Sequence, residues 1–285
     1  MIYLRKPDWL KIRLSKGEDY LKIKEIVRSH HLHTICESGD CPNLGECWSL
    51  GTATFMILGN ICTRNCKFCA VTTGKPNPVD EQEPQRVADS IRLMNLKHCV
   101  ITSVDRDDLN DYGSTAWAKT VKAIKEINPK TTIEVLIPDF NGNLNCVQKI
   151  IDAAPEIISH NLETVRRLTP LIRNKAQYDI SLKILSCIAD SGVTAKSGIM
   201  LGLGETESEV LETMDDLIQT GCKILTIGQY LQPNKENYPV KEYVTPQQFD
   251  KYKEIGLDKG FTHVESAPLV RSSYHAEKQI KPNLS

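Results

Sequence analysis

Two groups of closely spaced cysteines carry the chemistry that this sequence suggests. Six of the ten cysteines form them: Cys36, Cys41 and Cys47 have the spacing C-x4-C-x5-C, and Cys62, Cys66 and Cys69 have the spacing C-x3-C-x2-C. A four-iron cluster takes four ligands, so a site built on either triplet is one cysteine short. Because an iron without a cysteine can bind another molecule, each triplet predicts a cluster at which chemistry can take place.

Simpler metal sites are alternatives to these clusters. A zinc ion would need a fourth nitrogen or sulfur ligand, which His31 or His33 could supply to the first triplet. No fourth cysteine stands at ferredoxin spacing beside the second triplet, which argues against simple electron transfer. The four remaining cysteines lie among apolar neighbours and are expected to be small core residues: Cys99, Cys146, Cys187 and Cys222.

Length and composition narrow the class of protein. The chain has 285 residues, 40% of them hydrophobic, which is enough to bury the core of one large domain or two small ones. A net charge of -1 leaves no basic excess for nucleic acid. The sequence lacks the apolar segment of a signal peptide and any run long enough to span a membrane. Clustered cysteines in such a chain predict metal ligands in a reducing compartment, and hence a cytoplasmic location.

From residue 54 onward, the sequence alternates between strand patterns and helix patterns. Strands are predicted at 54–59, 98–102, 131–137, 156–159, 196–201 and 223–228. Helices are predicted at 84–96, 114–127, 144–153, 160–168, 176–190, 205–220 and 246–259. Six such units predict a parallel α/β sheet with right-handed crossovers, either doubly wound or closed into an incomplete barrel.

Polar residues follow every predicted strand. The second cysteine triplet follows the first strand, and Ser103 and Asp105 follow the second. Asn161 and Glu163 follow the fourth strand, and Gln229 follows the sixth. Because the carboxyl ends of parallel strands meet at one edge of the sheet, these side chains should form one site.

The segment Cys62-Thr63-Arg64-Asn65-Cys66-Lys67-Phe68-Cys69 resembles the signature of the radical S-adenosylmethionine superfamily, including the aromatic Phe68 before the last cysteine. The resemblance implies a partial (β/α)6 TIM-like barrel that holds a 4Fe-4S cluster. It also implies that S-adenosylmethionine chelates the open iron and is cleaved to a 5′-deoxyadenosyl radical.

The same resemblance gives the strand-end residues roles in binding the cofactor. It places Ser103 and Asp105 near the methionine amino group, Asn161 and Glu163 near the ribose or carboxylate, and Arg173 opposite the methionine carboxylate. Phe68 and Gln229 complete the expected cofactor contacts. The glycines of Gly202-Leu203-Gly204 would let the backbone approach the cofactor closely.

Motifs along nearly the whole chain, from about Lys6 to His275, look like those of the lipoyl synthase family. They read CPNL at 41–44, GTATFMILG at 51–59, ITSVDRDDL at 101–109, HNLE at 160–163, GLGET at 202–206, GQYLQP at 228–233 and RSSYHA at 271–276. In that family the first triplet holds an auxiliary 4Fe-4S cluster, and the serine before the tyrosine of RSSY is its fourth ligand. That serine is Ser273 here.

The resemblance also implies the reaction. Two sulfur atoms are inserted at C6 and C8 of a protein-bound octanoyl-lysine, the auxiliary cluster supplies the sulfur, and two S-adenosylmethionine molecules are used for each lipoyl group. The implied partners are an octanoylated carrier, either a glycine-cleavage H protein or a dehydrogenase E2 domain, and an electron donor such as flavodoxin or ferredoxin. Unactivated C–H bonds are not acidic enough for a side chain to remove the proton, so the reaction needs a radical that abstracts a hydrogen atom.

We expect three parts: residues 1–50 with the auxiliary cysteines, a core at 51–260, and a tail at 261–285 that closes over the auxiliary cluster. Another sulfur-inserting radical enzyme with an auxiliary cluster is the first alternative, and a non-catalytic electron-transfer protein is the second. The chain departs from the family at Tyr112, where a glycine is usual, and at Arg166, where a proline is usual. Because of these two changes, the resemblance does not determine the shape of the loops that carry them.

Overall fold

The structure, a computed structural model, describes residues 5–11, 18–49 and 54–279. The predicted boundary at 50/51, the start of the GTATFMILG motif and the end of the tail from 280 lie outside the described residues.

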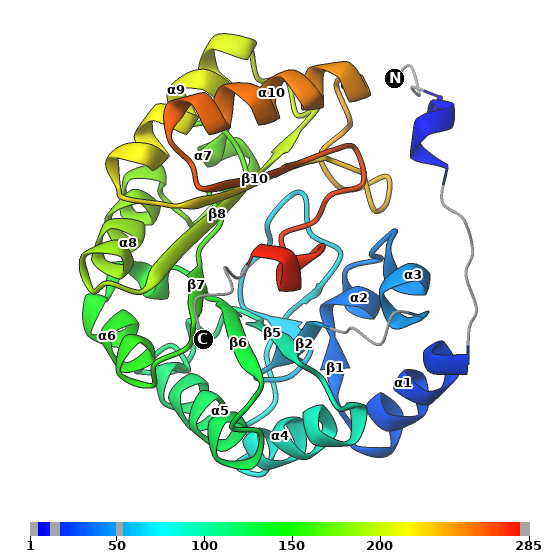
Figure 1. The fold of residues 1–285 in the computed structure, drawn as a ribbon, viewed down its shortest axis with the longest axis vertical. Coiled ribbons are helices and arrows are strands. Elements are labelled where there is room, and N and C mark those ends of the chain that lie inside the picture. The colour runs from blue at the N-terminus through cyan, green and yellow to red at the C-terminus, as the bar shows by residue number, and fades with distance from the viewer. Residues whose placement is uncertain (1–4, 12–17, 50–53, 280–285) are drawn as a thin grey trace.

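One eight-stranded sheet organises the fold, in the order β1-β2-β5-β6-β7-β8-β9-β10. Its strands are β1 (His33–Thr34), β2 (Thr54–Ile57), β5 (His98–Ser103), β6 (Thr132–Leu136), β7 (Ile157–Ser159), β8 (Thr194–Leu201), β9 (Ile224–Gln229) and β10 (His263–Ser266). β1 is antiparallel to β2, and the other neighbouring strands are parallel. Among the described residues β1 does not pair with β10, so the sheet is an open arc, as Figure 1 shows. The predicted partial barrel is confirmed.

Helices form a ring outside this arc (Figure 1). They are α1 (Glu18–Ser29), α4 (Glu83–Met94), α5 (Ser114–Ile127), α6 (Leu144–Asp152), α7 (Thr169–Ile172), α8 (Tyr178–Asp190), α9 (Glu207–Gln219) and α10 (Pro246–Lys259). Each long helix buries one apolar stripe against the strands; α5, for example, buries Trp117, Val121 and Ile124. This spacing of three to four residues is what the sequence pattern predicted.

Two predictions about the elements need correction. The segment 160–168 is not a helix: Leu162, Val165 and Leu168 are buried at helical spacing, but Glu163 has a φ of 67° and bridges to Ile199 of β8. The strand predicted at 223–228 is not the last one, because β10 follows it, pairs in parallel with β9 and adds a seventh parallel strand to the six predicted ones. In both places tertiary pairing overrides the local pattern.

The segment around Asn43 meets the segment around Leu269 across the arc. The N-terminal part contains the short helices η1 (Asp8–Leu10), α2 (Ile35–Ser38) and α3 (Leu44–Ser49). The C-terminal segment turns back inside the ring and ends in η3 (Ala276–Gln279), as Figure 1 shows. The side chain of Asn43 donates a 2.7 Å hydrogen bond to the carbonyl of Leu269, which joins these two segments.

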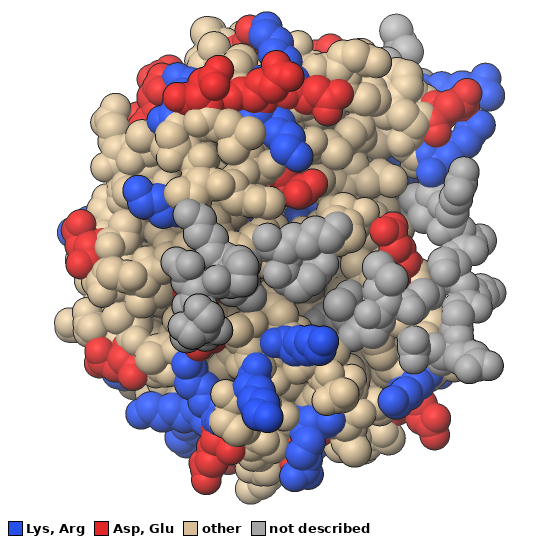
Figure 2. Space-filling model, viewed as in Figure 1, with Lys and Arg blue, Asp and Glu red and all other residues tan. Residues whose placement is uncertain are grey.

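Charges of both signs lie on the face shown in Figure 2, with an acidic band over α10 and basic side chains below, over α4 and α5. None of the helices that the structure describes has both the length and the apolar composition of a membrane span.

Candidate active site

A cavity of about 570 Å³ lies at the carboxyl edge of the sheet. Each of the ten residues predicted to form the radical site and the cofactor contacts lines it: Cys62, Cys66, Phe68, Cys69, Ser103, Asp105, Asn161, Glu163, Arg173 and Gln229. The cavity also reaches Ile35 and Pro42, next to the first cysteine triplet, and Ser272 in the C-terminal segment. The structure therefore brings residues from six strand ends and both chain termini to one space.

The loop that carries the second triplet is held by backbone contacts. It leaves β3 (Ile61–Cys62), which pairs with β4 (Thr72–Thr73). The N–H of Lys67 donates to the carbonyl of Ile172 at 2.8 Å, and the side chain of Asn237 donates to the carbonyls of Lys67 and Cys69. A loop fixed at several points can present three thiols in one geometry.

Backbone N–H groups point at two of these thiols. Cys62 Sγ accepts hydrogen bonds from the N–H groups of Arg64 and Asp105, and Cys69 Sγ accepts one from Val71, each at 3.4 Å. Burial raises the pKa of Cys66 to about 12 and that of Cys69 to about 11. Buried thiols of this kind become thiolates when a bound cation offsets the charge, and N–H donors to sulfur are a usual feature of iron–sulfur sites.

Sequence reasoning missed a buried ion network beneath the triplet. The guanidinium of Arg64 binds Asp107 through two hydrogen bonds of 2.9 and 2.8 Å, and it binds Asp139 at 2.8 Å. Burial acts to lower the pKa of Arg64, but these carboxylates raise it above its ordinary value. The network ties the cysteine loop to the loops after β5 and β6. Its signal in the sequence is an arginine inside the cysteine motif with acidic residues after two strands.

Two polar atoms in the cavity wall have no partner within the described part of the chain. Ser103 Oγ and Asn161 Oδ1 are buried and make no hydrogen bond there. Buried polar atoms are nearly always satisfied, so these two fit a polar ligand that enters the cavity. Both residues were predicted to contact the cofactor.

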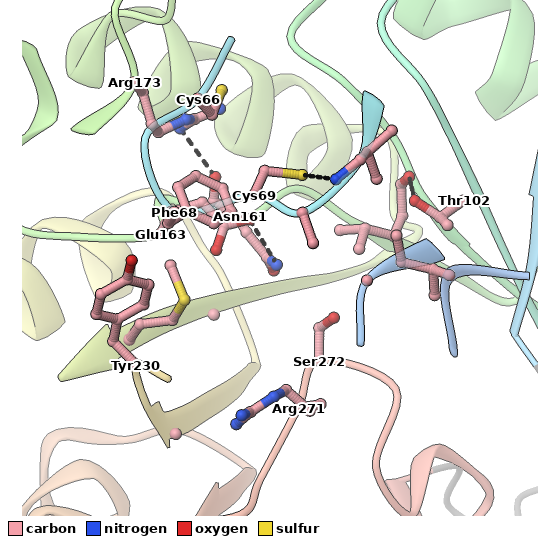
Figure 3. Close-up of a pocket in the computed structure, with 18 of the residues that line it drawn as sticks. Cys66, Phe68, Cys69, Thr102, Asn161, Glu163, Arg173, Tyr230, Arg271 and Ser272 are labelled. Carbon is pink, nitrogen blue, oxygen red and sulfur yellow. Dashed lines mark hydrogen bonds between the residues drawn. The ribbon is translucent and has the colours of Figure 1, made fainter. Parts of the chain in front are cut away.

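Glu163 and Arg173 lie beside Asn161 (Figure 3). Asn161 Nδ2 donates to Glu163 at 3.1 Å, and Arg173 Nη1 donates to the carbonyls of Asn161 and Leu162 at 3.1 and 3.2 Å. Desolvation raises the pKa of Glu163, while the charge of Arg173 opposes the rise. The left-handed backbone of Glu163 is unusual for a residue with a side chain, and such strain is common at functional sites.

Two predicted contacts have another explanation in the structure. The amide of Gln229 is fully buried; its Nε2 donates to the carbonyls of Leu201, Tyr230 and Glu242, and its Oε1 accepts from the N–H of Val244. A Cβ at Gly202 would lie 2.2 Å from the Gln229 amide, so this glycine permits close packing of two loops. Neither Gly202 nor Gly204 is among the residues that line the cavity, so the lining gives no support to the predicted approach of this backbone to the cofactor.

The first triplet lies against the C-terminal segment. Thr54 Oγ1 donates a 2.9 Å hydrogen bond to Ser273 Oγ, and Thr54 also makes hydrogen bonds to Cys36. The positive charge of Arg271 acts on Cys41, and the Tyr274 hydroxyl donates to Glu46, the residue before Cys47, at 3.2 Å. Ser273 therefore lies beside Thr54, which in turn contacts Cys36 of the first triplet.

The thiols of the second triplet are suitable ligands for an iron–sulfur cluster. In the described ranges no three His, Cys, Asp or Glu side chains converge at distances that suit one metal ion. A four-iron cluster holds its thiolates further apart, and the buried thiols with N–H donors match its needs. The residues present therefore fit a 4Fe-4S cluster at the second triplet.

Comparison with known proteins gives a consistent result. Residues 56–217 match the Radical SAM superfamily, and residues 2–41 match the N-terminal domain of lipoyl synthase of the Radical SAM family. The crystal structure of methylornithine synthase (PylB) shares the fold, with a TM-score of 0.57 and 10% identity over 88% of this chain and 78% of that one.

Lipoyl synthases are similar over almost the full length. The enzyme of Parabacteroides distasonis is 66% identical over 98% of this chain and 99% of its own. That of Phocaeicola vulgatus is 64% identical over 99% of both. This likeness supports neither of the alternatives that the sequence left open, a different sulfur-inserting enzyme and an electron-transfer protein. The chain belongs to the lipoyl synthase family of radical S-adenosylmethionine enzymes, which use a 4Fe-4S cluster and S-adenosylmethionine.

Proposed function

We propose that this chain inserts two sulfur atoms at C6 and C8 of an octanoyl-lysine on a lipoyl-carrier protein. The auxiliary 4Fe-4S cluster of the first triplet is the sulfur-donating substrate, and two S-adenosylmethionine molecules are used for each product. One observation carries the proposal: a single cavity extends from Cys62, Cys66 and Cys69 to the neighbours of the first triplet, Ile35 and Pro42. An acyl chain in this cavity would have a hydrogen-abstracting centre on one side and a sulfur source on the other.

The apolar part of the cavity wall supports this placement of the chain. Val104, Leu136, Ile137, Ile199 and Val270 line it. Apolar walls bind an octanoyl chain and exclude water from the space around it. The lysine amide would then point outward to the carrier.

The residues near the second triplet would bind the catalytic cluster and different groups of S-adenosylmethionine. Cys62, Cys66 and Cys69 would hold the catalytic cluster, and the network of Arg64 would keep their loop in place. Ser103, Asp105 and Asn161 offer polar atoms to S-adenosylmethionine, Glu163 and Arg173 offer charges, and Phe68 offers an aromatic face. Gln229, whose amide is engaged by the backbone, shapes the wall. When bound, the cluster and S-adenosylmethionine supply the radical that breaks an unactivated C–H bond.

The first triplet and the C-terminal segment would form the sulfur site. Cys36, Cys41, Cys47 and Ser273 are its proposed ligands. A serine oxygen is a poorer match for iron than a thiolate, so it should release more easily when the cluster is consumed. The contact from Thr54 to Ser273 supports this ligand set.

The partners and the organisation of the chain extend the proposal. The carrier would be a glycine-cleavage H protein or a dehydrogenase E2 domain, and the electron donor a flavodoxin or ferredoxin, in the cytoplasm. The chain would have three parts, an N-terminal segment at 1–50, a core at 51–260 and a tail at 261–285 that closes over the auxiliary cluster.

Anaerobic reconstitution tests the proposal. The loaded protein is incubated with S-adenosylmethionine, a reductant and an octanoyl-lysine peptide, and the products are measured by mass spectrometry. We expect 5′-deoxyadenosine and a peptide with two added sulfur atoms. Cys62→Ala should abolish 5′-deoxyadenosine, whereas Cys41→Ala should keep it and abolish sulfur insertion. Peptide that gains no sulfur despite 5′-deoxyadenosine formation would contradict the proposed reaction.

A further inference from the structure

Thr54 lies between residues from the two parts of the proposed sulfur site. Its hydroxyl donates to Ser273 Oγ at 2.9 Å, across 219 positions of the sequence. Thr54 is the first residue of β2 and is 6% exposed, so its side chain is fixed by the sheet. Among the described residues this is the only hydrogen bond to the Ser273 hydroxyl.

Cys36 has donors that do not depend on the Thr54 hydroxyl. The backbone N–H of Thr54 makes a hydrogen bond to Cys36, and the indole of Trp48 lies beside the same thiol. The indole N–H of Trp48 is fully buried and makes no hydrogen bond within the described part of the chain, so it remains a donor on this side of the thiol. The Thr54 hydroxyl also acts on Cys36, but it has one proton to donate, and in the structure it donates to Ser273 Oγ at 2.9 Å.

We propose that Thr54 is a positioning residue of the sulfur site, whose hydroxyl stabilises Ser273 as an iron ligand. This inference rests on the proposed ligation by Ser273. A serine that binds iron carries negative charge on its oxygen, and a donor fixed at 2.9 Å stabilises that charge. Without the donor, the charged oxygen would lie against the apolar wall of β2 with no hydrogen bond, and ligation would weaken.

The test measures the stability of the auxiliary cluster alone. Cys62, Cys66 and Cys69 are first replaced by alanine in the full chain, so that only the first triplet can hold a cluster. Thr54→Val, which keeps the shape and removes the hydroxyl, is then introduced, and loss of the cluster to a chelator is followed by its visible absorption. We expect loss about fivefold faster, the equivalent of one hydrogen bond of ~1 kcal/mol. Thr54→Ser should restore the original rate.

Two controls separate this role from a general effect on folding. Thr120→Val removes a buried hydroxyl of α5 that bonds only within its own helix, and it should leave the rate unchanged. In a Ser273→Ala background, Thr54→Val should accelerate the loss clearly less than it does when Ser273 is present, because only the contact of the hydroxyl with Cys36 is then removed. If Thr54→Val does not take up a cluster, Thr54→Ala serves as the second variant, with the same expectation of rescue by serine.

The outcomes distinguish this inference from the proposed function. An unchanged rate in Thr54→Val, or an equal acceleration with and without Ser273, overturns the role of Thr54. If Ser273→Ala itself loses the cluster at the original rate, serine ligation fails, and the proposed function loses that ligand. Faster loss in Ser273→Ala with no effect of Thr54→Val would leave the ligand set in place and remove only the positioning residue.

Discussion

The hydroxyl of Tyr274 donates a hydrogen bond to the carboxylate of Glu46 at 3.2 Å, although 228 positions separate them in the sequence. Burial and the charge of Glu46 raise the pKa of Tyr274 to about 12, so the phenol remains a donor at neutral pH. Glu46 precedes Cys47, and Tyr274 follows Ser273. This bond therefore fastens the C-terminal segment beside the proposed sulfur site.

Tyr274→Phe should loosen that segment without unfolding the barrel. The bond is partly exposed, so we expect a loss of roughly 0.5–1 kcal/mol of local stability. Amide hydrogen exchange at residues 269–276 should become about two- to fivefold faster. Tyr252→Phe on α10 is the matched control, and it should leave exchange in this segment as it was. Equal exchange in Tyr274→Phe and the original chain would show that other contacts hold the segment.

Arg64→Lys should impair cleavage of S-adenosylmethionine while keeping the positive charge. A lysine cannot reproduce the forked contact with Asp107 together with the contact to Asp139. Loss of one charged hydrogen bond corresponds to about a tenfold effect, and we expect at least that decrease in 5′-deoxyadenosine formation. Arg92→Lys, an exposed pair with Asp89 on α4, is the control. Similar rates of 5′-deoxyadenosine formation in both variants would show that the network of Arg64 does not contribute to cleavage.

Lys196→Met should destabilise the barrel strongly. The ammonium of Lys196 and the carboxylate of Glu134 are fully buried and lie 2.8 Å apart, joining β8 to β6. Removing one charge leaves the other buried and unpaired, which costs about 3–5 kcal/mol. Chemical denaturation of the metal-free protein measures the change. Adding Glu134→Leu should recover much of it, because the unpaired charge is then gone.

The control for this prediction is Lys251→Met, which removes the exposed pair with Glu207. Exposed pairs contribute about 0–1 kcal/mol, so this variant should stay close to the original stability. A Lys196→Met protein as stable as the control would mean that Glu134 is satisfied without the lysine.

The stability of the protein should fall between pH 7 and pH 5, in part through His160. Its Nδ1 donates to the carbonyl of Ile137, and its Nε2 accepts from Ser181, each at 2.9 Å. Burial, followed by the charge of Arg173, lowers the pKa of His160 to about 4. The unfolded chain takes up a proton near pH 6.5 and the folded chain only near pH 4, so stability is lost as pH falls through this window.

His160→Gln should remove that part of the pH dependence. We expect the original chain to lose roughly 2 kcal/mol more than the variant between pH 7 and pH 5, measured by urea unfolding of the metal-free protein. His31→Asn, at an exposed histidine, should keep the full dependence. If the free energy of unfolding falls equally with pH in the original chain and in His160→Gln, His160 is not the source of the pH dependence.

The sequence predicted the repeating part of the fold because each unit carries its own pattern. Buried runs such as 98–102 became β5, and the amphipathic stretch 114–127 became α5. Strand β10 was missed because it has only four residues, and His263 and Glu265 alternate with its buried ones. Its identity as a strand comes from β9 beside it, and a single sequence does not show such long-range pairing.

The candidate site was predictable where a motif is local. The second triplet occupies eight consecutive residues, and its cysteines line the cavity. The contacts of Arg64 with Asp107 and Asp139 were not predicted, because these residues come from three different loops. No local pattern in the sequence predicts which residues Ser273 contacts. It lies beside Thr54 because the folded chain brings two segments together that are 219 positions apart.

These long-range contacts also bear on the order of events during synthesis. The second triplet, with its loop and its first strand, has been made before most of the barrel leaves the ribosome. The first triplet is made earlier still, yet the contacts of its neighbours Asn43, Thr54 and Glu46 span 226, 219 and 228 positions. Their partners are Leu269, Ser273 and Tyr274. Those contacts can form only after translation has passed residue 274. Iron delivered to a nascent chain would meet an incomplete sulfur site, so that site should be filled after translation, as the last step in making the enzyme.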